Sequence, residues 1–197
     1  MNKRIAIYGL NANPPGNHHV AIVKALTLKF DLVYVVPSGG RPDKSDTECV
    51  KSVHRGMMSA LAFCGIPKVI VDFSDVNNGT FTPTVNLGSR YEGDGEGEVR
   101  IVVGADIVKG GWKGESQIEM EWKEGEWIWE EANLTIIKRP DYDLSDGDLP
   151  PNGEVIEMEL SGSSTEIRRM IGEGKTTGVG VPASVMDYMV EWGLYRV

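Results

Sequence analysis

The chain has 197 residues, of which 41% are hydrophobic and 25% charged, and this composition excludes the disordered and fibrous classes. Asp and Glu outnumber Lys and Arg by 29 to 20, and the net charge of -9 argues against nucleic acid or an anionic membrane as a partner. A chain of this length buries roughly 70% of its unfolded surface. We therefore expect a single domain over residues 1–197 that needs neither disulfide nor structural metal.

The cysteines and the N-terminus favour a cytoplasmic location. Cys49 and Cys64 lie in apolar, helix-like sequence without C-x-x-C spacing, so we expect them to be reduced packing residues. The apolar run at residues 5–8 is too brief for a signal peptide, and no stretch approaches the roughly 20 apolar residues of a membrane span.

Six short apolar runs have the composition of strands that are buried on both faces of a parallel sheet. They span residues 4–8, 32–36, 68–73, 99–103, 134–138 and 155–160. Residues 20–28 and 50–63, which lie between them, place apolar side chains at helical spacing. This alternation predicts an α/β fold, a Rossmann-like open parallel sheet with helices on both faces.

The remaining segments are less regular. Residues 91–98 and 141–153 are rich in turn formers and predict loops. The tryptophan-rich stretch at residues 111–131 fits neither the helical nor the strand period, so its elements stay unassigned. Residues 181–195 predict a packed terminal helix, with Pro182 at its start and Gly193 beyond its end.

A turn of small residues follows the first predicted strand, and it is the first candidate ligand site. Gly9 ends the strand, and a helix is expected to begin near Asn17, with His18 and His19 in its first turn. Open α/β sheets bind ligands at the carboxyl ends of their strands, and a helix start attracts anions. The turn is neither G-x-G-x-x-G nor a Walker A loop. An ordinary loop with two exposed histidines remains the alternative.

A second candidate phosphate site follows the last predicted strand, at the run from Gly162 to Thr165. Its hydroxyls can cap a helix or donate to phosphate, and Arg168 lies about one turn further on. Ordinary N-capping and a solvated arginine are the alternatives here. Two helix starts at one edge of the sheet favour the phosphate interpretation.

These fragments resemble the signatures of the nucleotidyltransferase superfamily, G-x-x-F-[DN]-P-x-H-x-G-H and I-S-S-T-x-I-R. Further matches, in the family's order over nearly the whole chain, narrow the resemblance to the nicotinate/nicotinamide mononucleotide adenylyltransferase family. They are Val36-Pro37-Ser38 through Pro42-Asp43-Lys44, Arg55 to Met58, Phe81-Thr82, Gly104-Ala105-Asp106, Lys138-Arg139-Pro140 and Gly193-Leu194-Tyr195.

The chain departs from the family pattern at its first signature. Gly16 stands where the family has its first histidine, His18 where it has glycine, and Ala12 where it has phenylalanine, so only His19 falls on a family histidine. The side chain of His18 would either obstruct the nucleotide or supply the imidazole that is missing at Gly16.

The resemblance implies transfer of AMP from ATP to nicotinate or nicotinamide mononucleotide, which releases pyrophosphate and forms a dinucleotide in NAD biosynthesis. The partners would be small nucleotides, with Mg²⁺ held by ATP rather than by protein ligands, and a homo-oligomer is left open. Two alternatives remain. One is another superfamily member, such as a pantetheine-phosphate adenylyltransferase or a cytidylyltransferase, and the other is a nucleotide-binding protein whose catalysis is weakened by Gly16.

The same resemblance implies the roles of individual residues. The expected catalytic residues are His18, His19, Lys44 and Arg168. The expected ATP-binding residues are Gly9, Leu10, Asn11, Gly16, His19, Gly104, Asp106, Ser163, Ser164, Thr165 and Arg168. The expected mononucleotide-binding residues are Asn13, Lys44, Thr82, Trp112 and Arg139, with Trp112 stacked on the pyridine and Trp122 and Trp127 as alternatives.

Overall fold

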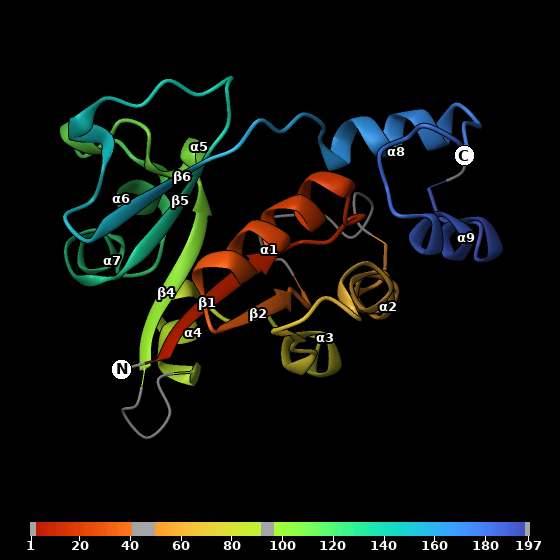
Figure 1. Ribbon diagram of the computed structural model, residues 1–197, viewed down its shortest axis with the longest axis horizontal. Helices are drawn as coiled ribbons and strands as arrows, with labels where there is room; N and C mark the ends of the chain where they lie inside the picture. Colours follow the sequence, from red (N-terminus) through yellow and green to blue (C-terminus); the bar gives the residue numbers. More distant parts are fainter. Residues whose placement is uncertain (1–2, 41–49, 92–96, 196–197) are drawn as a thin grey trace.

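The computed structural model describes residues 3–40, 50–91 and 97–195. Its centre is a six-stranded sheet in the order β3-β2-β1-β4-β5-β6, in which every neighbouring pair is parallel (Figure 1). The strands are β1 (Lys3–Leu10), β2 (Leu32–Pro37), β3 (Val69–Val71), β4 (Gly97–Gly104), β5 (Leu134–Lys138) and β6 (Gly153–Glu157). The predicted α/β fold is therefore confirmed.

Each predicted apolar run overlaps one strand; the central strands β1 and β4 extend beyond their runs at both ends, whereas the edge strands β3 and β6 do not. Strand β3 keeps only three residues of the run at 68–73, and β6 starts two residues before the run at 155–160 and ends three residues before its end. Both strands have a hydrogen-bonded neighbour on one side only, so pairing extends them less than the central strands.

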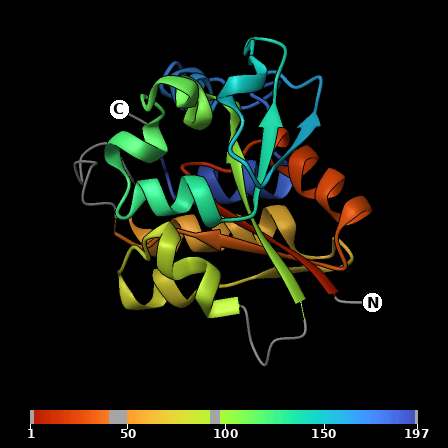
Figure 2. The ribbon, with the colours of Figure 1, turned by 90° about the vertical axis from the view of Figure 1, so that its left-hand side faces the viewer.

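Helices cover both faces of the sheet (Figure 2). Successive side chains of the central strands point to opposite faces, so the sheet lies between two apolar layers. Ala6, Tyr8 and Val102 face one layer, which holds α1 (Asn17–Lys29), α2 (Ser52–Phe63), α8 (Ser164–Gly172) and α9 (Ala183–Glu191). Ile101 and Val103 face the other layer. It holds α5 (Ala105–Val108), α6 (Gln117–Glu121) and α7 (Gly125–Glu131).

The remaining elements are short. They are α3 (Ser74–Asn78), α4 (Thr84–Tyr91) and the 3-10 turns η1 (Gly111–Lys113) and η2 (Asp146–Asp148). The unassigned tryptophan-rich stretch thus forms η1, α6 and α7, none of which is long enough to show a helical period. No helix in the described ranges is long and apolar enough to span a membrane.

One expectation about a single residue needs correction. Cys64 is not a packing residue, because it lies exposed at the carboxyl end of α2; Cys49 lies outside the described residues. The terminal helix α9 begins after Pro182, as predicted, and it ends at Glu191; Trp192 is its C-cap, and Gly193 follows with a φ of 60°.

The strand order also locates the ligand site. Connections from β1 run to one side through β2 and β3, and the chain then returns to continue on the other side at β4. The carboxyl ends of β1 and β4 therefore lie side by side at the point where the order reverses. In open α/β sheets this is where a crevice for ligands forms.

Candidate active site

A cavity of about 660 Å³ opens at this reversal point. Its walls come from the carboxyl ends of β1 and β4, the first turns of α1, the start of α4 and helices α5 and α6. Among the residues expected from the sequence, seven line it: Gly9, Leu10, Asn11, His19, Gly104, Asp106 and Arg139. Segments that are far apart in the sequence thus meet at one site.

The start of α1 holds both histidines in place. Gly16 is the N-cap, and its N–H donates to Nδ1 of His19 at 2.9 Å. Because Nδ1 accepts this bond, the proton of a neutral His19 lies on Nε2. The rings of His18 and His19 are 3.9 Å apart, and His18 is only 6% exposed. The alternative of two solvent-exposed histidines is therefore wrong.

Both imidazoles are neutral at pH 7 in the absence of ligand. Burial, followed by the charge of Arg139, lowers the pKa of His18 to about 4. Burial, followed by His18 and Arg139, lowers the pKa of His19 to about 3. Neither side chain consequently carries a positive charge. His19 lines the cavity and can offer its Nε2–H to a ligand, whereas His18 does not line it.

The ring of His18 fills the space beside Gly16. A Cβ built on Gly16 would lie 2.6 Å from Cε1 of His18 and 2.8 Å from Cδ1 of Ile167, a residue of α8. Neither distance is compatible with a real carbon contact. A side chain at position 16 would therefore require His18 and Ile167 to shift, and His18 packs between the starts of α1 and α8.

Two hydrogen bonds join the start of α8 to the turn after β1. Ser164 Oγ donates to the carbonyl oxygen of Pro14 at 2.9 Å, and Arg168 Nη1 donates to that of Asn13 at 2.8 Å. Ser163 caps the helix by accepting the N–H of Glu166 at 3.1 Å. The hydroxyl of Ser163 therefore performs the capping function, and both helix starts lie at one edge of the sheet, as the sequence indicated.

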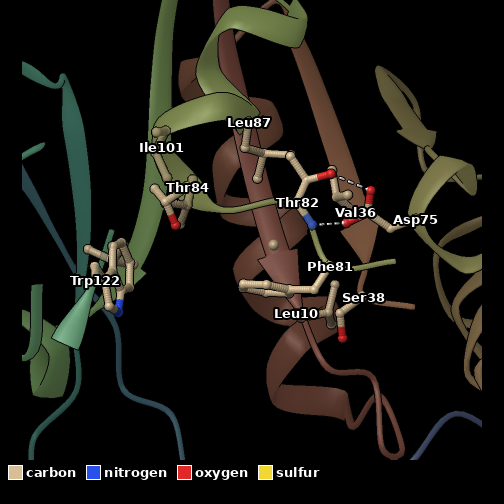
Figure 3. A pocket seen from close by; sticks show the side chains of 13 residues that line it. Leu10, Val36, Ser38, Asp75, Phe81, Thr82, Thr84, Leu87, Ile101 and Trp122 are labelled. Carbon is tan, nitrogen blue, oxygen red and sulfur yellow. Dashed lines mark hydrogen bonds between the residues drawn. The ribbon is translucent and has the colours of Figure 1, made fainter. Parts of the chain in front are cut away.

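A smaller cavity of about 130 Å³ continues from the larger one (Figure 3). The two share lining residues, namely Gly9, Leu10, Phe81, Thr84, Val102, Val103 and Trp122. We call the smaller one the inner cavity. Trp122 stands on one side of it, and Phe81 and Thr82 stand on the other. An aromatic ring on each side makes the space suitable for a flat apolar ring.

The structure does not bring every expected residue to these cavities. Several expected residues at the two helix starts and in the turn before α1 line neither of them, namely Asn13, Gly16, His18, Ser163, Ser164, Thr165 and Arg168. Trp112 lies on η1, 63% exposed, and lines neither of them; Trp127 on α7 is 52% exposed and lines neither as well. Trp122, one of the two alternatives, is the tryptophan that lines both. Lys44 lies outside the described residues.

Glu121 and Lys123 also line the larger cavity, and nothing in the sequence had singled them out. They flank Trp122 at the end of α6, a helix of five residues. A family motif or a helical period could have identified them, but neither exists in this stretch.

Known proteins of similar sequence and structure point in the same direction as this geometry. No protein-family model matches the chain. It is 28% identical over 188 residues to a probable nicotinate-nucleotide adenylyltransferase of Kineococcus radiotolerans, covering 93% of this chain and 86% of that protein. It is 29% identical over 198 residues to the protein of the same name in Leifsonia xyli, covering 98% and 94%.

Solved structures agree on the fold. The nicotinic acid mononucleotide adenylyltransferase of Plasmodium falciparum, solved with NaAD, superposes with a TM-score of 0.78 at 22% identity over 98% of this chain and 97% of that one. A putative nicotinate-nucleotide adenylyltransferase from Vibrio parahaemolyticus gives 0.63 at 21% identity, over 95% and 99%.

The sheet order, the two joined helix starts at its reversal point and the solved neighbours define the fold: the chain has the nucleotidyltransferase fold. The curated relatives that it matches over nearly its full length are probable nicotinate-nucleotide adenylyltransferases, which agrees with the predicted family.

Proposed function

We propose that this protein transfers AMP from ATP to nicotinate or nicotinamide mononucleotide, releasing pyrophosphate and forming the dinucleotide of NAD biosynthesis. One observation carries the proposal most directly. The starts of α1 and α8 are joined by the bonds from Arg168 to Asn13 and from Ser164 to Pro14, beside a cavity large enough for two nucleotides in contact. The names of the relatives support the substrate class.

The reaction needs alignment and charge stabilisation more than proton transfer. The attacking phosphate of a mononucleotide is already ionised at neutral pH, so it needs no general base when it attacks the α-phosphorus of ATP. Negative charge then moves onto the leaving pyrophosphate. Preorganised donors that face this group lower the barrier, and correct placement of the two substrates supplies most of the rest.

Three groups at the joined helix starts are suited to the pyrophosphate. Arg168 keeps guanidinium donors beyond the two bonds that it makes to protein atoms. His19 presents its Nε2–H at the cavity wall. The N-terminal N–H groups of α8, a nine-residue helix, add donors, and we expect Lys44 to contribute a further charge.

The two halves of the cavity suit the two nucleosides. Asp106 lies after β4 and offers a carboxylate that can accept ribose hydroxyls of ATP. Thr82 and Trp122 line the inner cavity, and we propose that Trp122, rather than Trp112, stacks on the pyridine ring. Arg139 lines the larger cavity, where it can contact the mononucleotide, whereas Asn13 is buried and lines neither cavity.

The divalent cation is expected to enter as part of the ATP substrate. Over the residues that the structure describes, no group of three or more His, Cys, Asp or Glu side chains could hold a metal ion. Phosphate oxygens are hard ligands that suit Mg²⁺, which keeps several of its waters. We therefore propose Mg²⁺-ATP as the substrate. The cytoplasmic location, the single domain and any homo-oligomer stay predictions.

A pyrophosphate-release screen tests the proposal. Purified protein would be incubated with Mg²⁺-ATP and one acceptor, either nicotinate mononucleotide, nicotinamide mononucleotide or phosphopantetheine, and parallel reactions would contain CTP. We expect pyrophosphate release only when ATP is combined with a pyridine mononucleotide. Release with phosphopantetheine or CTP would support another superfamily member. No release from protein with a cooperative melting transition would favour a nucleotide-binding protein without turnover.

A further inference from the structure

The wall of the inner cavity opposite Trp122 is a short connection between α3 and α4, residues 79–83. It carries Phe81, which is 41% exposed and lines both cavities, and Thr82, which lines the inner one. A loop wall of this length holds a ligand in one geometry only if other parts of the protein fix it. The contacts of Thr82 show how this is achieved (Figure 3).

Thr82 donates two hydrogen bonds, one from its N–H and one from its hydroxyl, to the buried carboxylate of Asp75. Its N–H donates to Oδ2 of Asp75 at 2.8 Å, and its hydroxyl donates to Oδ1 at 2.7 Å. The side chain of Asp75 is only 4% exposed. Hydrogen bonds to a charged acceptor are stronger than neutral ones, and a buried carboxylate is costly to leave unpaired.

Arg90 of α4 supplies the matching positive charge. Its Nη2 lies 2.9 Å from Oδ1 of Asp75 and also contacts the hydroxyl of Thr82, while Nη1 lies 3.6 Å from Oδ2 of Asp72. The connection is thus held between a carboxylate on α3 and a guanidinium on α4. Arg90 itself does not line either cavity.

The backbone fixes the other end of the same connection. The N–H of Thr80 donates to the carbonyl oxygen of Asp75 at 2.9 Å, and the N–H of Gly39, directly after β2, donates to that of Thr80 at 2.9 Å. A Cβ on Gly39 would overlap both of these carbonyl oxygens, so only glycine allows this approach.

We propose that Asp75 and Arg90 are positioning residues for the mononucleotide: they hold Phe81 and Thr82 at the distance from Trp122 that the pyridine ring requires. The proposal rests on the proposed function. Asp75 lines the inner cavity and is the charged residue among those that do, but its oxygens already accept three donors from the protein. Its role is therefore exerted through Thr82 rather than on the reacting atoms.

The test is the steady-state kinetics of Asp75→Asn with each substrate varied in turn. The amide keeps the shape but removes the charge and one acceptor, so Thr82 and Arg90 lose their shared partner. We expect KM for the pyridine mononucleotide to rise about tenfold or more. KM for ATP should stay within about twofold, because the expected ATP contacts at His19 and Asp106 lie on other elements.

Asp148→Asn is the matched control. Asp148 is 5% exposed, and it also accepts the N–H and the hydroxyl of one residue, Ser145, at 2.9 and 2.8 Å, together with the N–H of Gly110 at 2.8 Å. It lines neither cavity. The Asp148→Asn variant should lose a similar amount of unfolding free energy without a selective rise in KM for the pyridine mononucleotide. Arg90→Met should behave like Asp75→Asn, and Arg90→Lys should recover part of the loss.

The outcomes separate this inference from the proposed function. If the wild-type protein releases no pyrophosphate with either pyridine mononucleotide, the proposed function is wrong and the inference is rejected with it. If the wild type is active but Asp75→Asn leaves the mononucleotide KM unchanged, only the inference is rejected. Equal rises for both substrates, or the same pattern in Asp148→Asn, would show that Asp75 is merely structural.

Discussion

At the scale of single residues, the departure from the family pattern at Gly16 and His18 has a structural explanation. The imidazole of His18 occupies the volume that a side chain at position 16 would need, between the starts of α1 and α8. The sequence indicated that one histidine had moved by two positions. It could not show that the two positions compete for one space, because this depends on Ile167, which lies far away in the chain.

Exchanging the histidine between these positions tests that explanation. Gly16→His alone should lower the melting temperature strongly and abolish turnover, because its Cβ meets both His18 and Ile167. His18→Gly removes one obstacle, so the double variant should be more stable than Gly16→His. If the double variant also regains turnover that His18→Gly alone has lost, His18 supplies the missing imidazole. Higher activity in His18→Gly alone would show instead that the ring obstructs the nucleotide.

Arg168→Ala should separate catalysis from stability. A cation placed for the leaving pyrophosphate acts in the transition state, so we expect turnover to fall on the order of 10²-fold or more. The lost bond to Asn13 should cost about 1 kcal/mol of unfolding free energy. Arg169→Ala is the control, since Arg169 is 54% exposed and pairs with Glu166 and Glu173 on the same helix. A large loss of stability with normal turnover would make Arg168 structural.

The buried histidines should make stability depend on pH. Burial lowers the pKa of His18 to about 4 and that of His19 to about 3, below the unfolded value of about 6.5, so folding favours the neutral rings. This stability is fully present above pH 6.5 and is lost as the pH falls toward 4 and 3. Melting between pH 7 and 4 should therefore show a decline that the double variant His18→Gln/His19→Gln reduces. An equal decline in both proteins would contradict these shifts.

At the scale of elements, the sequence predicted the sheet and the long helices because they bury continuous apolar faces. Strand β1 and helix α1 carry that pattern over eight and thirteen residues, and both were found. The apolar pattern did not predict the elements between residues 111 and 131, where α6 and α7 have only five and seven residues. Trp122 consequently could not be distinguished from Trp112, because its place in the cavity depends on how these short helices pack.

Gly125 is the position that allows α6 and α7 to pack together. A Cβ there would overlap the carbonyl oxygen of Ile118 on α6. We expect Gly125→Ala to lower the melting temperature and to raise KM for the mononucleotide, because Trp122 lies between the two helices. Gly172→Ala, whose Cβ would meet only Tyr195 at 3.8 Å, should change neither quantity. A normal KM in Gly125→Ala would show that Trp122 does not bind the substrate.

At the scale of the whole molecule, stabilising charges and the candidate site lie at opposite ends of the sheet. Arg4 and Arg100 each pair with both Glu98 and Glu154 near the amino ends of β1, β4 and β6, and Arg100 is only 8% exposed. The cavities lie at the carboxyl ends. The sequence predicted which edge binds ligands, because the turn after the first strand and both helix starts follow the carboxyl ends of strands. The ion-pair network could not be predicted, because it requires the register of strands far apart in the chain.

Identification of the product is the sharpest test of the proposed adenylyl transfer. Protein incubated with Mg²⁺-ATP and an equimolar mixture of nicotinate and nicotinamide mononucleotides would be analysed by mass spectrometry and for pyrophosphate. We expect a pyridine dinucleotide in amounts equal to the pyrophosphate released, and no product when Mg²⁺ is chelated. Folded protein that leaves both mononucleotides unchanged, or that releases pyrophosphate without forming a dinucleotide, would contradict this proposal.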